Sequence, residues 1–388
     1  MKIGIVHNET KYSGGAFVAE NYLARILKKA SADVGIEVLD IYPKHDGKRG
    51  LRTLYIFVFN KLFSGEFISF LFRRLGWRFP SRFERSLIKQ KIDCVFFLGT
   101  YLEALILKKI PFVIVVWDLG HRDLVGSPET YQWGNFDFRE DNLQLVCRKA
   151  FTIITDSKRM MSRLEQSYGV DKERTIPINL FPDDYDTILN LKIRKKEIQR
   201  ERYLLYPANF WSHKNHITLL EALKFNKLNN IDSYKLIFTG SDKGRRRTLE
   251  RLAHEFELLD RIEFHDFVSR DQLLNLYLDS EGLVYPSLLG PTNIPPMEAL
   301  LLGIPLYVAE DSATNILRFK GVTSLDPFDV ESWAKVLSLI SENKAKTRIG
   351  SANRQALQSL HENNIVTLKE MLKKMESKLR LYRSCLDE

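Results

Sequence analysis

Cysteine is scarce in this sequence. Only three of its 388 residues are cysteines, and they lie far apart, at Cys94, Cys147 and Cys385. No two of them form a CxxC pair. An odd number of dispersed thiols argues against a disulfide framework and against a structural zinc site, and it is typical of a protein in a reducing compartment.

A secretory signal is also missing. The opening residues MKIGIVHNET contain one lysine and a short strand-like run that breaks into polar residues. A signal peptide needs a longer apolar stretch followed by small residues at a cleavage site. We therefore expect a cytoplasmic protein.

Negative charge is in deficit. The chain has 58 Lys and Arg against 49 Asp and Glu, a net charge of +9. Such an excess suits nucleic acid, an anionic membrane surface or phosphorylated substrates. Neither zinc-finger spacing nor an aromatic RNA-binding motif is present, so we expect no nucleic-acid partner.

Short apolar runs alternate with helix-like segments along the whole chain. In the first half the runs are KIGIVHN, VGIEVLDIY, DCVFFLG, PFVIVVWD and FTIITDS, and in the second RYLLYPAN, YKLIFTG, RIEFHDF, GLVYPS and PLYVAE. This alternation predicts parallel sheets covered by helices on both faces. We therefore predict an α/β protein of two Rossmann-like domains, residues 1–178 and 179–370, followed by a C-terminal helix over 371–388 that returns to the first domain.

Ligands of such sheets bind beyond the carboxyl ends of the strands, where loops lead into helix N-termini. Gly14 and Gly15 lie in the first of these loops. Two glycines there let the backbone approach an anionic ligand closely, although a glycine pair is also a common turn device.

Several blocks of the second half follow one another in a specific order: YPANFWSHKNHITLLEAL, FTGSDKG and HDFVSRDQLLNLYLDSEGLVYPSLLGPTNIPPMEALLLGIPLYVAE. Their succession resembles the retaining glycosyltransferases of family 4, which have the GT-B fold. The similarity is strongest from Tyr203 to Glu310 and weaker at SGGAFVAENYLARIL, VVWDLGHRD and FTIITDSKRMMSRLEQSYGV. It implies two domains facing across a deep cleft. It also implies transfer of a hexose-type sugar from a UDP- or GDP-sugar to a glycan or lipid-linked acceptor, in bacterial surface-polysaccharide or lipopolysaccharide assembly.

The resemblance assigns a cation to the donor diphosphate. Lys214 matches the family's basic residue, which stabilises the charge that grows on the departing nucleoside diphosphate; the alternative is a surface lysine. The family usually has an arginine earlier in this loop, where this sequence has Asn209. Basic residues that could replace it, or form a solvated helix start, are Lys243, Arg245, Arg246 and Arg247.

The resemblance also places Glu298 on the donor ribose, unless that residue is only an acid near a helix N-terminus. The family's other glutamate falls at Gly290, inside the loop GPTNIPP. Backbone groups of this loop are expected to face the sugar and phosphate, and further donor contacts are expected along the second domain. The residues concerned are Gly240, Val268, Thr292, Asn293 and Ile294.

A third candidate group follows the strand-like run PFVIVVWD. The family often has a histidine directly before the aspartate, where this sequence has Trp117. We expect Asp118 to orient a hydroxyl of donor or acceptor and His121 to supply a catalytic imidazole. The alternative is a helix-capping aspartate beside a surface histidine. His213 and His216 suit a loop and a helix start better than a metal site, and we expect neither a metal nor another cofactor.

Basic and aromatic residues are concentrated at about 44–91, in the stretch that contains LYIFVFNKLFSGEFISFLFRRLGWRFPSRFERSLIKQK. Its polar positions recur every three to four residues, which predicts an amphipathic helix rather than a membrane span. Such a face suits peripheral binding to an anionic membrane at the inner face of the cytoplasmic membrane. It equally suits a helix packed on its own sheet with its arginine heads in water.

Two other functions remain open at this point. Asn209, Gly290 and Trp117 would suit a catalytically weakened nucleotide-sugar-binding subunit. A dinucleotide-dependent oxidoreductase would need GxGxxG after the first strand, and the loop there reads only SGG.

Overall fold

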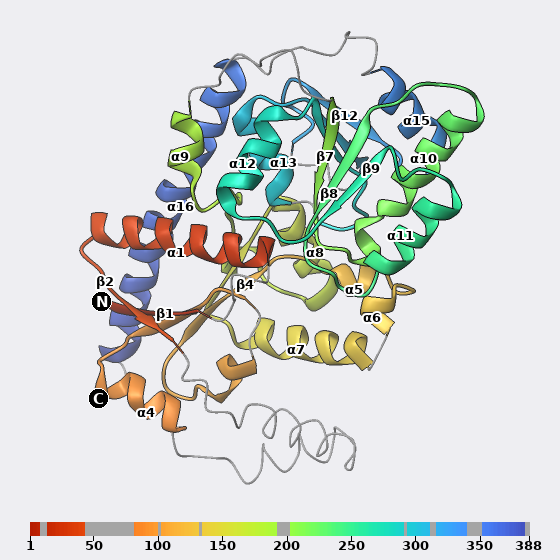
Figure 1. Cartoon of the computed structure of the whole chain (residues 1–388). Coiled ribbons are helices and arrows are strands. Elements are labelled where there is room, and N and C mark those ends of the chain that lie inside the picture. Colours follow the sequence, from red (N-terminus) through yellow and green to blue (C-terminus); the bar gives the residue numbers. More distant parts are fainter. Residues whose placement is uncertain are drawn as a thin grey trace.

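The computed structural model describes residues 1–7, 14–42, 81–99, 102–131, 134–191, 202–290, 293–310, 316–339 and 351–384. Within them the chain forms two six-stranded sheets, one after the other along the sequence (Figure 1). Most of the basic aromatic segment expected at 44–91 lies outside the described residues, as does Cys385.

The first sheet has the strand order β2-β1-β3-β4-β5-β6, and every pairing is parallel. Its strands are β1 (Lys2–Val6), β2 (Glu37–Ile41), β3 (Cys94–Phe97), β4 (Phe112–Val116), β5 (Thr152–Thr155) and β6 (Thr175–Pro177). The helices of this half are α1 (Gly15–Asp33), α4 (Arg82–Lys89), α5 (Gly120–Asp123), α6 (Pro128–Tyr131), α7 (Asn135–Lys149) and α8 (Lys158–Tyr168), with short 3-10 turns η2 (Leu102–Ile106) and η4 (Lys172–Arg174).

The second sheet has the order β12-β11-β10-β7-β8-β9 and is also parallel throughout. Its strands are β7 (Tyr203–Pro207), β8 (Lys235–Thr239), β9 (Ile262–His265), β10 (Gly282–Tyr285), β11 (Leu306–Ala309) and β12 (Val322–Leu325). Around it lie α9 (Tyr185–Asn190), η5 (Ser212–Lys214), α10 (His216–Leu228), α11 (Arg246–Glu255), α12 (Arg270–Asp279), α13 (Ile294–Leu302) and α15 (Val330–Leu339).

The central strands are buried on both faces, which explains their apolar composition. Val113, Ile114 and Val115 of β4 have no exposed surface, and Leu204 and Leu205 of β7 are equally buried. A parallel sheet has helices on both faces, so alternate residues on each strand all enter a core. The predicted two-sheet α/β architecture is confirmed.

The last helix, α16 (Ser351–Ser384), is longer than the helix expected over 371–388. In Figure 1 it runs in blue along one side of the molecule, from the second sheet to the first. It contacts α13 of the second half and α1 of the first. One helix thus joins the two halves.

Buried polar side chains fasten α16 to the first half. Asn364 donates from Nδ2 to the Tyr22 hydroxyl at 2.9 Å and to the Asn179 carbonyl at 2.7 Å. Its Oδ1 accepts the Asn179 backbone N–H at 3.0 Å. The Tyr22 hydroxyl also lies 2.9 Å from Nδ1 of His361. Because buried polar groups need partners, this network favours a single position of α16 against the first half.

No helix among the described residues is both long enough and apolar enough to span a membrane.

Replacing Asn364 should loosen this junction. Asn364→Ala leaves the Asn179 backbone groups without their partner in a partly buried site, which costs roughly 1–3 kcal/mol of unfolding free energy. The neighbouring Asn363 is exposed, so Asn363→Ala is the matched control and should change stability little. Urea unfolding of both variants measures the difference, and equal midpoints would contradict the role given to this network.

Candidate functional site

Loops at the carboxyl ends of the two sheets meet each other. A side chain at Gly14, which precedes α1, would come within 3.0 Å of Nδ2 of Asn209 after β7. A side chain at Gly120, after β4, would come within 2.8 Å of Leu289 after β10. Glu129 of α6 accepts the backbone N–H of His213 at 3.3 Å. We call these segments, 14–15, 118–121, 128–131, 209–214 and 287–294 in their described residues, the facing loops.

Lys214 ends the facing loop that follows β7. Its Nζ donates to the Tyr285 hydroxyl at 3.1 Å, to Oγ of Ser287 at 3.3 Å and to Oδ1 of Asn293 at 3.1 Å. All three acceptors are uncharged, and burial lowers the pKa of the lysine to about 8 while Asp118 opposes the change. Within the part of the chain that the structure describes, no carboxylate lies within ion-pair distance of Nζ. The site therefore offers a partly desolvated cation to an anion.

Asn209 and Gly240 lie next to each other in the loops that follow β7 and β8. Oδ1 of Asn209 accepts the Ser241 backbone N–H at 2.9 Å. A side chain at Gly240 would meet the Ala208 carbonyl oxygen at 2.4 Å, so glycine is required there. The two donor-site candidates thus lie side by side, at the ends of β7 and β8.

Of the four basic residues near α11, Arg247 is exposed, and the other three differ in what they contact. Arg245 donates from Nε to Oγ of Ser212 at 2.5 Å, two residues before Lys214. Lys243 lies 5.8 Å from the ring centre of Trp211. Arg246 is paired with Glu250 and Asp266 instead. Arg245 and Lys243 are therefore the basic residues of this group that reach the Lys214 loop.

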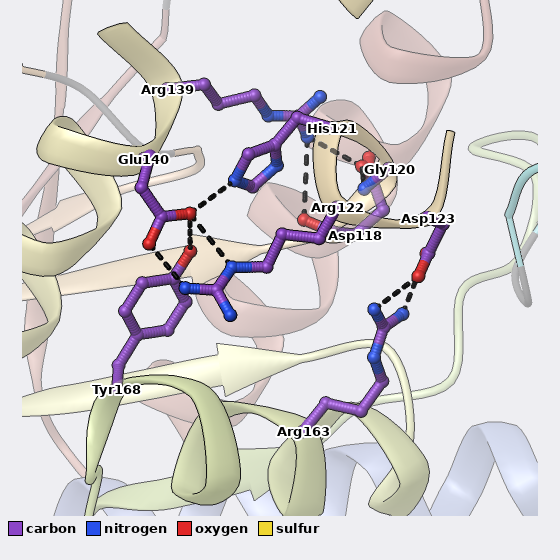
Figure 2. Close-up of polar contacts among 9 residues, drawn as sticks. All are labelled: Asp118, Gly120, His121, Arg122, Asp123, Arg139, Glu140, Arg163 and Tyr168. Atoms are coloured by element: carbon purple, nitrogen blue, oxygen red, sulfur yellow. Dashed lines mark hydrogen bonds and ion pairs between the residues drawn. The ribbon is translucent and has the colours of Figure 1, made fainter. Parts of the chain in front are cut away.

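Asp118 lies at the end of β4 and is fixed by two donors. The Gly120 backbone N–H donates to its Oδ1 at 2.7 Å, and Nη2 of Arg139 on α7 does so at 2.6 Å (Figure 2). Burial raises the pKa of Asp118, but Arg139 and the Gly120 N–H outweigh burial and hold that pKa below its usual value. A fixed carboxylate beside the Lys214 loop can orient a hydroxyl group.

His121 belongs to a separate cluster. Its ring is only 2 % exposed, and Nε2 lies 3.0 Å from Oε2 of Glu140. Arg122 and Tyr168 donate to the same carboxylate, from Nε at 2.8 Å and from the hydroxyl at 3.0 Å (Figure 2). Burial lowers the pKa of His121, although Glu140 opposes the change. The imidazole is thus committed to Glu140 rather than to Lys214, and its catalytic role stays a prediction.

Glu298 is also held by protein groups. Its side chain is buried on the first turns of α13, and both carboxylate oxygens accept hydrogen bonds, one from Arg270 and one from Tyr277. Burial raises the pKa of Glu298, against the effect of Arg270. The residue expected to bind ribose is therefore already fixed in direction.

The loop before α13 shows why glycine occupies position 290. Gly290 has φ +98°, and a side chain there would come within 2.9 Å of Oδ1 of Asn293. Nδ2 of Asn293 donates to the carbonyls of Leu289, at 3.2 Å, and Gly290. Asn293 therefore closes the loop on itself and turns its Oδ1 to Lys214, in the space where a side chain at 290 would begin.

The remaining candidates have different environments. Gly15 opens α1, with open space where a side chain would be. Val268 is partly buried after β9. Ile294 is buried in the core and begins α13. Thr292 lies outside the described residues. Among the residues that can be described, no group of three or more His, Cys, Asp or Glu side chains is arranged to hold a metal ion.

Sequence reasoning missed the partners of the candidates. These are Arg139, Glu140, Asp184, Arg270, Tyr277, Tyr285 and Ser287. Tyr285 and Ser287 end the apolar run GLVYPS, so the rule that sites follow strands could have found them. No sequence signal marks the others, since their partners lie 19 to 86 positions away.

The two parallel sheets give the chain the GT-B fold, and the facing loops lie at the carboxyl ends of both sheets. Residues 190–356 match the family described as Glycosyl transferases group 1. It is 28% identical over 200 residues to the O-antigen chain mannosyltransferase RfbU of Salmonella typhimurium, which covers 52% of this chain and 54% of that protein. It is 29% identical over 108 residues to the D-inositol 3-phosphate glycosyltransferase of Mycolicibacterium smegmatis, covering 27% and 25%. The chain thus spans about half, or less, of the length of these curated relatives.

Solved structures show the same fold over nearly the whole chain. Sucrose-phosphate synthase from Thermosynechococcus elongatus superposes with a TM-score of 0.68 at 17% identity, covering 97% of this chain and 99% of that one. Anabaena HepE in complex with UDP-glucose superposes with a TM-score of 0.62 at 15% identity, covering 97% and 100%. At such identities the likeness establishes the fold.

Glu140 should contribute to stability in a pH-dependent way. Hydrogen bonding to Arg122, reinforced by His121 and Tyr168, lowers the pKa of Glu140 from 4.5 to about 2. The contribution is therefore complete above its ordinary pKa and is lost as pH falls toward 2. In urea unfolding, Glu140→Gln should be less stable than wild type at pH 7, and the gap should narrow below pH 4.5.

Asp141, the next residue of α7, is exposed, and Asp141→Asn serves as the control. A gap between wild type and Glu140→Gln that stays constant from pH 7 to pH 3 would contradict the account of this cluster.

Proposed function

We propose that this protein is a glycosyltransferase that takes a sugar from a nucleotide-sugar donor bound at the facing loops. The observation that carries the proposal is Lys214, a partly desolvated lysine with three uncharged partners. A leaving nucleoside diphosphate gains negative charge as the glycosidic bond breaks, and a positioned cation lowers the energy of that state. The names of the relatives and of the similar solved structures support the same activity.

The roles of the other residues follow from their places. Lys214 lies on the diphosphate, with Arg245 close enough to the same turn to add a second positive charge. Glu298 receives the ribose hydroxyls. Asp118, held by Arg139 in the first half, is close enough to raise the pKa of Lys214, and it orients a hydroxyl of the donor or the acceptor.

The finer assignment combines resemblance with these contacts. We propose transfer of a hexose-type sugar with retention, from a UDP- or GDP-sugar to a glycan or lipid-linked acceptor in bacterial surface-polysaccharide assembly. One relative is named an O-antigen chain mannosyltransferase, and one structural neighbour contains UDP-glucose. Peripheral contact with an anionic membrane belongs to the same proposal, and the charge of the chain, +9, supports it.

The test is turnover of UDP- and GDP-sugars by wild type and by Lys214→Ala. Loss of the cation should lower kcat by about two to three orders of magnitude, as for other groups that stabilise developing charge. Lys172 of η4 is largely exposed and pairs with Glu165, so Lys172→Ala provides the control. Binding of nucleotide-sugar without any turnover in wild type would instead favour a binding subunit.

The same assay run in excess EDTA tests whether a metal takes part. Because Lys214 supplies the positive charge at the diphosphate, we expect wild-type turnover to survive chelation. Complete loss that magnesium or manganese restores would overturn the metal-free mechanism and leave the donor site in place.

A further inference from the structure

A partly buried ionic chain joins Glu298 to the segment between the two sheets. Its members are Asp184, Arg270, Glu298 and Tyr277. Asp184 precedes α9, on the stretch that leads from β6 to β7. Arg270 begins α12, and Glu298 lies on α13. Three separate parts of the chain therefore meet at one guanidinium.

Arg270 uses both sides of its planar group. Nη1 donates to Oε1 of Glu298 at 2.5 Å. Nε and Nη2 donate to the two carboxylate oxygens of Asp184, at 2.8 Å and 2.7 Å. A paired contact of this kind fixes direction as well as distance, and lysine cannot reproduce it because an ammonium is a point charge.

Tyr277 fixes the other oxygen of Glu298. Its hydroxyl donates to Oε2 at 2.7 Å, and its ring is fully buried on α12. Glu298 thus has one hydrogen bond on each oxygen, both from the same helix. Each carboxylate oxygen can accept a second hydrogen bond. The remaining acceptor positions are therefore held in a set orientation, which suits two adjacent hydroxyl groups.

Charge makes Arg270 necessary at this place. Two carboxylates, Asp184 and Glu298, lie on either side of one cation. A buried carboxylate without a partner takes up a proton or turns toward water, since desolvation disfavours its charged form. Removal of Arg270 would therefore change both the ionisation and the direction of Glu298. The Tyr277 hydroxyl also lowers the pKa of Glu298, so its removal would act in the same sense but would leave the cation in place.

We infer that Arg270 and Tyr277 are positioning residues that orient the Glu298 carboxylate toward the vicinal hydroxyls of the donor ribose. Asp184 holds the other side of the Arg270 guanidinium and so links this orientation to the segment between the two sheets. The inference rests on the proposed function, because it needs a nucleoside diphosphate in the site. On this inference, Arg270, Tyr277 and Asp184 form a clamp on Glu298 that selects ribose over sugars that lack these hydroxyls. None of the three is among the predicted donor-binding residues.

The test compares binding of UDP and GDP with binding of their 2′,3′-dideoxy counterparts by titration calorimetry. For whichever of UDP and GDP the wild type binds, its affinity should exceed that for the 2′,3′-dideoxy form of the same nucleotide by about tenfold or more, as expected for hydrogen bonds to a charged group. Arg270→Met and Tyr277→Phe should reduce this preference to near unity, and Arg270→Lys should leave an intermediate value. Arg251→Met changes an exposed arginine on α11 and should keep the full preference.

The possible outcomes separate the two proposals. Wild type that binds neither diphosphate overturns the proposed function. Wild type that binds a diphosphate with no preference for ribose keeps that function and overturns the inference. The inference is also overturned if Arg270→Met and Tyr277→Phe both fold and both keep the preference for the ribonucleotide. If Arg270→Met fails to fold, Tyr277→Phe decides, because it keeps the buried ring and removes only the hydroxyl.

Discussion

A lysine ammonium surrounded by uncharged oxygens is the constraint on which the account depends. Burial of Lys214 lowers its pKa to about 8, so its charge is maintained near neutral pH at some energetic cost. Hydroxyl and amide oxygens of Tyr285, Ser287 and Asn293 offset part of that cost. An anion that entered would offset more of it, and binding energy of this kind becomes useful in catalysis when the anion's charge rises along the reaction.

That arrangement requires the two halves to be held against each other. Lys214 and Asn293 come from the second half, whereas Asp118 and Gly14 come from the first, and all four lie beyond the carboxyl ends of strands. The contacts of α16 with α1 and α13 join the halves on another side of the molecule. The path from β6 to β7 carries Asp184, so the same connection that joins the sheets also contributes to the clamp on Glu298.

Much of this was accessible from the sequence. Apolar runs and glycine-rich turns predicted two parallel sheets. The spacing and length of apolar runs, and the position of a turn after a strand, are local properties of the sequence. The resemblance to family 4 glycosyltransferases, rather than these local patterns, assigned Lys214, Asn209, Gly240 and Asn293 to one donor site. Glu140 and Arg270 could not be found in this way, since their roles depend on which distant side chains the tertiary packing brings to them.

Two residues, Gly290 and His121, show how the role of a side chain depends on tertiary packing. In the sequence, Gly290 stands where the family has a glutamate, and it indicated only that an acidic side chain is absent there. In the structure its positive φ and the closeness of Asn293 explain the loss, because the amide occupies the space and supplies an oxygen to Lys214. His121, in contrast, carries a reactive side chain at a plausible position, and its pairing with Glu140 became visible only in three dimensions.

The central claim is that Lys214 recognises the second phosphate of a nucleotide donor. The most direct measurement is the affinity of wild type and Lys214→Ala for a nucleoside diphosphate and for the monophosphate of the same base. The account predicts that wild type prefers the diphosphate and that the variant binds the two about equally, with the wild-type preference declining as pH rises above about 8. A preference for the diphosphate that is as large in Lys214→Ala as in wild type would contradict it.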